Sequence, residues 1–255
     1  MSWIKNQNIS IFFSEKSDGN LKLSKENNSL LNKKIADNRI IFFRKNNINP
    51  SRLVNAECVH GASIEIITHD NLLGSGALDP ATQIKNTDGL ITNIKNSYLM
   101  ITGADCFPIF FYDTKKQIIG IAHAGWKGVL SEIAPNMVSE FKNNFGSNPA
   151  DIQVYIGPGI KSCHFEVKKD VVKLFKDKYK NQIISRNDRY FIDLPAIIAL
   201  QLNKAGVKPE NIIKHPDCAF CEGKYFSYRR DKLTNPELVE GPEIVEAQAY
   251  IIHLK

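Results

Sequence analysis

Two histidines and one cysteine lie at the ends of apolar segments, where side chains can point into a cleft. These residues are His60, Cys106 and His123, and a glycine is close to each of them, which lets the backbone approach a ligand. Two imidazoles and one thiolate form a zinc-ligand set, and an open fourth position makes such a site catalytic. Their spacing is not that of a compact metal motif. The residues alone therefore leave two interpretations open, a metal site and buried core positions.

Asp105 directly precedes Cys106 in the segment GADCFP. A bound zinc ion would lower the pKa of its water to about 7 and polarise electrophiles. A neighbouring carboxylate could then orient a ligand or transfer a proton. The same aspartate could instead cap a turn, and both roles stay open.

Three further segments contain groups with chemical potential. Cys218 and Cys221 form a Cys-x-x-Cys motif near His215, but no second pair accompanies it, which favours a structural turn over a metal site. Cys163 and His164 are adjacent, and neighbours on a strand point to opposite faces, so a catalytic pair is not favoured.

Two adjacent arginines, Arg229 and Arg230, follow an aromatic run. One guanidinium could face a cleft and bind phosphate or carboxylate through two hydrogen bonds, which a lysine cannot do. Taken alone, an arginine pair is more typical of a solvated surface.

The elements that would position these groups are interleaved strands and helices. Apolar runs predict strands over 9–13, 99–101, 109–112, 117–123, 152–156 and 248–254 and one or two strands within 53–68. Helical spacing predicts helices over 129–141, 167–179 and 194–204, with a kink or a later start at Pro135 and an N-cap at Asp193. We interpret residues 14–39 as a surface loop region. The whole chain, residues 1–255, is expected to form one mixed α/β domain.

Composition limits the class of protein. The chain has 255 residues, of which 43% are hydrophobic and 24% charged, and this is the composition of an ordinary globular domain. No apolar run spans a membrane and the start lacks a signal peptide, so we expect a cytoplasmic protein. The net charge of +6 comes from scattered lysines, which does not favour nucleic-acid binding. Five cysteines, an odd number, argue against a disulfide framework.

Five ordered segments carry a family resemblance. CVHG, GADCFPI, IAHAGWKG, IGPGIKSCHFEV and CAFCEGKYFSYRRD resemble the motifs of the YfiH-like family, long called polyphenol oxidase or laccase-domain proteins and now described as purine nucleoside phosphorylases. The resemblance runs from about Asn38 to Asp231. It implies a mixed α/β, CNF/YfiH-like domain of layered sheets flanked by helices. It also implies a zinc site, with copper as the alternative, whose ligands are His60, Cys106 and His123.

The resemblance further implies an activity. The expected reactions are phosphorolysis of adenosine, inosine and S-methyl-5'-thioadenosine, together with adenosine deamination. Purine nucleosides and phosphate would then be the partners of a monomer or homodimer. Asp105 and Cys106 are the expected catalytic positions, and phosphate would bind Lys127, Arg229 and Arg230. The chain departs from the family pattern at Cys58, where glutamine is usual, at Lys127, where arginine is usual, and at His164, where cysteine is usual.

Three other functions compete with this one. Cys106 could be the nucleophile of a cysteine hydrolase with His123 as its base. The chain could also be a metal-stabilised interaction protein. A single-copper oxidase remains as the third alternative. A multicopper laccase is not favoured, because the six histidines include no His-x-His pair and are too few to supply a trinuclear copper cluster as well.

Overall fold

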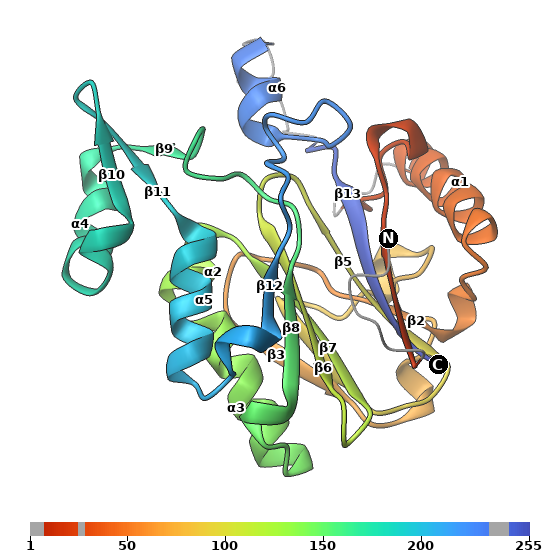
Figure 1. Cartoon of the computed structure of the whole chain (residues 1–255). Coiled ribbons are helices and arrows are strands. Elements are labelled where there is room, and N and C mark those ends of the chain that lie inside the picture. Colours follow the sequence, from red (N-terminus) through yellow and green to blue (C-terminus); the bar gives the residue numbers. More distant parts are fainter. Residues whose placement is uncertain (1–7, 25–28, 235–244) are drawn as a thin grey trace.

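Two β-sheets lie face to face between helices in the computed structural model of the chain (Figure 1). The structure describes residues 8–24, 29–234 and 245–255. A 4-stranded sheet has the order β1-β13-β5-β2 and a 6-stranded sheet has the order β12-β8-β6-β7-β4-β3. This arrangement confirms the expected mixed α/β class with layered sheets and flanking helices.

The strands of the two sheets are mostly short and apolar. The 4-stranded sheet contains β1 (Ile9–Phe13), β2 (Leu53–Asn55), β5 (Ser97–Gly103) and β13 (Gln248–Leu254). The 6-stranded sheet contains β3 (Ile64–Ile67), β4 (Gly89–Thr92), β6 (Phe107–Asp113), β7 (Ile118–Ala124), β8 (Ile152–Ile156) and β12 (Ile212–Lys214). Every residue of β5, β6 and β7 is buried, as expected for strands that are covered on both faces. The strands predicted over 9–13, 152–156 and 248–254 are confirmed at both ends.

Three apolar layers hold the sheets and helices together. The layer between the sheets includes Leu99 and Tyr250 of one sheet and Phe110 and Ile121 of the other. The outer face of the 6-stranded sheet packs against α2 (Trp126–Leu130), α3 (Ile133–Phe145) and α5 (Leu194–Lys204). The outer face of the 4-stranded sheet packs against α1 (Ser29–Lys45). Helices thus cover both outer faces, as Figure 1 shows.

A smaller unit extends from this body on the side of α5 (Figure 1). It contains the sheet of order β10-β11-β9, formed by β10 (Ile183–Arg186), β11 (Arg189–Ile192) and β9 (Glu166–Val167), and the helix α4 (Lys169–Tyr179). The last helix, α6 (Tyr228–Thr234), lies above the sheets in this view.

The helix expected over 129–141 is two helices. Glu132 adopts φ 59° between α2 and α3, and this left-handed conformation ends the first helix. Pro135 is the third residue of α3, where its missing N–H removes no helical hydrogen bond. Asp193 caps α5 as predicted, because its side chain accepts a hydrogen bond of 3.0 Å from the N–H of Ala196.

The structure differs from the surface-loop interpretation of residues 14–39. Leu21 and Leu23 are buried, and α1 begins at Ser29. The fully buried Arg39 donates hydrogen bonds to the carbonyl oxygens of Leu21, Gly76 and Ala77 at 2.7–2.8 Å. Arg39 occupies an inward-facing position of α1 and interrupts the apolar periodicity by which a helix is recognised. The sequence pattern therefore did not predict this helix.

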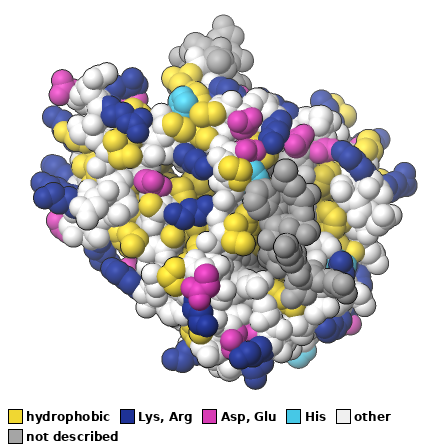
Figure 2. Space-filling model, in the orientation of Figure 1, with side chains coloured by type: hydrophobic (Ala, Val, Ile, Leu, Met, Phe, Trp, Pro, Cys, Tyr) yellow, Lys and Arg dark blue, Asp and Glu magenta, His cyan; other side chains and the backbone are white. Residues whose placement is uncertain are grey.

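The described part of the face seen in Figure 2 shows no single basic region. In Figure 2 the lysine and arginine side chains are spread over the visible face among acidic and apolar ones. Over the described ranges, none of the helices combines the length and apolar character that crossing a bilayer requires.

Candidate metal centre and its pocket

Pairing of two strands brings two of the predicted metal ligands to one end of the 6-stranded sheet. β6 and β7 are antiparallel, with Phe107 opposite Ala124, so Cys106 before β6 lies beside His123 near the end of β7. His60 comes from the loop between β2 and β3. The donor atoms of His60, Cys106 and His123 all lie within 4.8 Å of one another, and the two imidazole rings pack edge to face at 4.9 Å. The structure therefore brings this His₂Cys set together.

A residue that the sequence analysis missed, Asp88, holds two of the three ligands in place. Its Oδ1 accepts a hydrogen bond of 2.9 Å from Nδ1 of His123, which leaves Nε2 of that ring for a metal. Its two carboxylate oxygens also accept the backbone N–H groups of His60 at 2.9 Å and Gly61 at 2.7 Å. Burial alone would raise the pKa of Asp88, but these bonds outweigh it and the pKa is lowered. The only sequence signal for this role is an aspartate directly before a glycine that opens a buried strand.

The protonation of the site favours metal binding through Cys106. Burial would raise the pKa of this thiol, but the neighbouring imidazoles of His123 and His60 outweigh it and lower the pKa to about 6. Burial would lower the pKa of His123. The negative charges of the Cys106 thiolate and of Asp88 outweigh burial and raise this pKa well above its usual value. Cys58 lies nearby, and burial raises its pKa to about 11. Of these two cysteines, only Cys106 is a thiolate near neutral pH, the form that binds zinc.

The backbone is shaped closely around the three ligands. A Cβ atom at Gly125 would lie 3.0 Å from Sγ of Cys106 and 3.1 Å from Cδ2 of His60. Glycine at this position therefore leaves room for both side chains. His60 and Asp105 adopt φ values of 63° and 79°, in the left-handed region that is unusual for residues other than glycine. Such strained positions are concentrated at functional sites. The donor set, the oriented histidine and the open space together fit a bound zinc ion.

The three candidate metal ligands line a cavity of about 580 Å³, within the usual size range of small-molecule sites. His60, Cys106 and His123 form one side of it. Apolar and aromatic side chains form much of the rest, namely Leu23, Leu31, Trp126, Ile160, Phe165, Leu194 and Tyr228. A lining of this chemistry suits a mostly apolar small molecule with a few polar groups.

Asp105 and Arg229 also line the cavity. The Oδ2 of Asp105 accepts a hydrogen bond of 2.7 Å from the backbone N–H of Arg229, whereas its Oδ1 is buried without a hydrogen-bond partner among the described residues. Burial raises the pKa of this carboxyl. The Arg229 guanidinium donates to the carbonyl oxygen of Glu166 at 2.9 Å and lies over the ring of Phe165. Asp105 therefore caps the start of α6 through one carboxyl oxygen, and its other carboxyl oxygen is buried at the cavity wall.

Two of the residues expected to bind phosphate lie elsewhere. Lys127 is not among the described residues that line the cavity, and its Nζ lies 5.7 Å from the centre of the Trp126 ring. The Arg230 guanidinium donates to the carbonyl oxygens of Ala219 at 3.1 Å and Phe220 at 2.9 Å and to that of Tyr225. Arg230 thus holds the loop that precedes α6, and only Arg229 of the three basic candidates reaches the cavity wall.

The Cys-x-x-Cys motif and the adjacent Cys163 and His164, for which the sequence favoured no chemical role, also lie close together. Cys163 and His164 lie against Cys218 and Cys221, and the donor atoms of all four are within 4.8 Å of one another. This group is separate from the His₂Cys set, and none of its four residues lines the cavity. Spacing along the chain could not reveal it, because its two pairs are 55 residues apart.

Comparison with known proteins gives one family match. The model of the family described as multi-copper polyphenol oxidoreductase laccase matches residues 14–235. Purine nucleoside phosphorylase YlmD of Bacillus subtilis is 36% identical over 178 residues, which cover 65% of this chain and 64% of that protein. Adenosine deaminase RL5, from an unknown prokaryotic organism, is 35% identical over 153 residues, or 58% of each chain. The chain thus aligns with somewhat less than two thirds of the length of these two relatives.

A solved structure supports the same grouping. The crystal structure of YlmD from Geobacillus stearothermophilus matches with a TM-score of 0.87 at 28% identity, covering 98% of this chain and 93% of that one. The similarity therefore extends over all the layers of the fold, beyond the segments that align in sequence.

Proposed function

Since the chain belongs to the family of multi-copper polyphenol oxidoreductase laccase proteins, we propose that it is a zinc-dependent purine nucleoside phosphorylase that also deaminates adenosine. Adenosine, inosine and S-methyl-5'-thioadenosine are the proposed nucleosides. The names of the two relatives support both activities. The single observation that carries the proposal is the His₂Cys set at the wall of a cavity of nucleoside size.

His60, Cys106 and His123 would hold the zinc ion. A zinc ion in a site with an open position polarises electrophiles and makes water acidic enough to ionise near neutral pH. The Asp88 carboxylate keeps the proton of His123 on Nδ1, so that the ring offers Nε2. Copper is the alternative metal for this donor set.

The cavity walls would bind the purine and orient the sugar. Trp126, Phe165 and Tyr228 supply aromatic surface for a flat base, and Ile160 and Leu194 exclude water from it. Arg229 is the proposed phosphate ligand, because a guanidinium can form two parallel hydrogen bonds with phosphate oxygens. Lys127 and Arg230 are not proposed as phosphate ligands, because neither is among the described residues that line the cavity.

Asp105 is the proposed proton donor. Burial raises its pKa and Oδ1 has no hydrogen-bond partner among the described residues, so this oxygen can hold a proton. Phosphorolysis breaks the bond between the sugar and the base, and a positioned acid assists by protonating a nitrogen of the leaving purine. Once the product has left, the carboxylate takes up a proton again.

One observation favours a second candidate, the cysteine hydrolase. The thiolate of Cys106 beside the imidazolium of His123 is the pair that such an enzyme activates. In that case Cys106 would attack substrate and bind no metal.

The test compares purified wild type with Cys106→Ser, using Cys58→Ser as the matched control on the same wall. Metal content is measured, and each protein is incubated with adenosine and phosphate before the products are separated. We expect Cys106→Ser to lose about one zinc ion per chain together with adenine and inosine formation, while Cys58→Ser keeps both. A metal-free wild type that hydrolyses esters or amides would favour the hydrolase, and bound metal without product from any purine nucleoside would favour an interaction role.

A further inference from the structure

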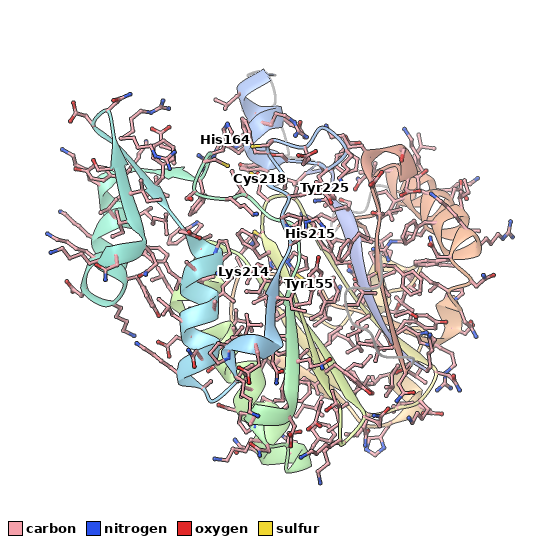
Figure 3. The ribbon with its side chains drawn as sticks, in the orientation of Figure 1. Tyr155, His164, Lys214, His215, Cys218 and Tyr225 are labelled. Atoms are coloured by element: carbon pink, nitrogen blue, oxygen red, sulfur yellow. The ribbon has the colours of Figure 1, made fainter. Side chains whose placement is uncertain are left out.

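A second group of metal-binding side chains lies beside the start of α6, apart from the cavity. It comprises Cys163, His164, Cys218 and Cys221, named here the Cys₃His cluster. Figure 3 shows His164 and Cys218 close together, on two loops that come from distant parts of the sequence. We propose that the Cys₃His cluster binds a structural zinc ion that joins these two loops.

The distances within the cluster match those around a tetrahedral zinc ion. Sγ of Cys163 lies 3.5 Å from Sγ of Cys218 and 3.7 Å from Sγ of Cys221. Sγ of Cys221 lies 3.3 Å from Nδ1 of His164. With zinc bonds of about 2.3 Å to sulfur and 2.0–2.1 Å to nitrogen, tetrahedral geometry separates the ligand atoms by roughly 3.5–3.8 Å. The donors already surround a centre of that size.

Turns make the convergence possible. Residues 162–164 form a turn, so the argument that adjacent side chains on a strand point to opposite faces does not apply to Cys163 and His164. Cys218 and Cys221 flank another turn, in which the N–H of Glu222 donates to the carbonyl of Cys218 at 3.0 Å. Each loop thus contributes two ligands, and four protein ligands form the closed set typical of a structural zinc site.

The surroundings stabilise a thiolate. The backbone N–H of Lys161 points to Sγ of Cys218 at 3.4 Å. The His164 ring stacks on Phe220 with 3.9 Å between ring centres, which orients its Nδ1 toward Cys221. Backbone donors to sulfur and an oriented imidazole are the surroundings that metal ligands require.

The zinc ion would stabilise one wall of the cavity. The loop containing Cys163 also provides Ile160 and Phe165, which line the cavity. Arg229 bonds the carbonyl oxygen of Glu166 just beyond this loop, and Arg230 bonds those of Ala219 and Phe220 in the other loop. The cluster is therefore a cross-link between two segments separated in sequence, and it does not depend on the reaction that the cavity supports.

The test measures metal in variants that separate the two sites. Wild type purified with reductant is expected to contain about two zinc ions per chain, and Cys106→Ser about one. Adding Cys163→Ser to Cys106→Ser removes the remaining ion, whereas adding His69→Ala, a change at an exposed histidine, does not. Cys163 is an exposed ligand, so its substitution leaves the core intact. Because the pocket ligand is already absent in these variants, the result does not depend on the proposed activity.

A spectroscopic measurement identifies the ligands. Metal-free Cys106→Ser loaded with Co²⁺ should show the intense visible absorption of a tetrahedral site and the charge-transfer absorption of thiolate ligands, and both should decrease in Cys163→Ser and in His164→Asn. Zinc-free Cys106→Ser would overturn the proposal. So would zinc content that is unchanged by Cys163→Ser, or a disulfide among the three cysteines found by mass spectrometry of the wild type.

Discussion

Oδ1 of Asp88 lies 2.9 Å from Nδ1 of His123, and both side chains are buried. The same carboxylate accepts the backbone N–H groups of His60 and Gly61. A single aspartate therefore orients the ring of one candidate metal ligand, His123, and holds the loop that carries another, His60. Asp88 thus links two of the three candidate ligands, His60 and His123.

Removing the charge of Asp88 should weaken metal binding. Asp88→Asn replaces one of the two accepting carboxylate oxygens with an N–H₂ donor, so the N–H groups of His123, His60 and Gly61 are left with a single acceptor oxygen and no negative charge. We expect zinc affinity, measured by competition with a chelator, to fall about 10–100-fold. Asp113→Asn is the control, because this equally buried aspartate accepts the N–H groups of Lys115 and Lys116 at the other end of β6. Equal affinities in the two variants would contradict the role assigned to Asp88.

The reactivity of Cys106 in metal-free protein should depend on pH. The folded protein lowers its pKa to about 6, so the thiolate is present above that pH and is lost as the pH falls through it. Iodoacetamide labelling of Cys106, followed by peptide mapping, should therefore be half-maximal near pH 6, and zinc should prevent it. Cys58, with a pKa raised to about 11, should stay unlabelled at neutral pH. In His123→Asn the Cys106 midpoint should move to higher pH, and an unchanged midpoint would show that the imidazole does not stabilise the thiolate.

The two adjacent arginines should affect different measurements. Arg229→Ala should raise the KM for phosphate about tenfold or more, since a charged hydrogen bond contributes about 1.5–3 kcal/mol. Arg230→Ala should leave that KM nearly unchanged and lower the free energy of unfolding by about 2–3 kcal/mol, because the carbonyl oxygens of Ala219, Phe220, Glu222 and Tyr225 lose this donor. Steady-state kinetics and denaturant titration measure both effects, and the reverse assignment would contradict the structure.

A methyl group at Gly125 should reduce metal affinity without unfolding the protein. The added Cβ would lie 3.0 Å from Sγ of Cys106, so the thiolate must shift within the site. Chelator competition should show weaker zinc binding in Gly125→Ala. Gly223→Ala is the control, because a Cβ there meets no atom within 4 Å. Wild-type affinity in Gly125→Ala would mean that the ligands have more freedom than their packing indicates.

Arg39 should be important for stability although it is charged. Arg39→Met leaves the carbonyl oxygens of Leu21, Gly76 and Ala77 without their donor in a buried layer. We expect the free energy of unfolding, from urea titration, to fall by about 2–5 kcal/mol. The control Arg44→Met changes an exposed residue of the same helix and should stay within about 0.5 kcal/mol of wild type. Similar losses in both would argue against a specific role of the buried guanidinium.

The sequence by itself determined the local elements and the types of the reactive residues. The strands at 9–13, 152–156 and 248–254 and the cap at Asp193 follow from short-range patterns, and the structure confirms them. His60, Cys106 and His123 could be selected because each stands next to an apolar run and a glycine. These properties can be predicted from the sequence because they depend only on residues that are close together in the chain.

Tertiary structure alone decided which of these residues meet. The pairing of β6 with β7 places Cys106 beside His123, and a buried hydrogen bond from a third strand orients the ring. Loops that are 55 residues apart bring Cys163 to Cys218, while Arg230 is directed into backbone carbonyls and Arg229 to the cavity. Such contacts depend on strand register and loop closure. These are set by the packing of the whole core, and a pattern of spacings along the chain does not contain them.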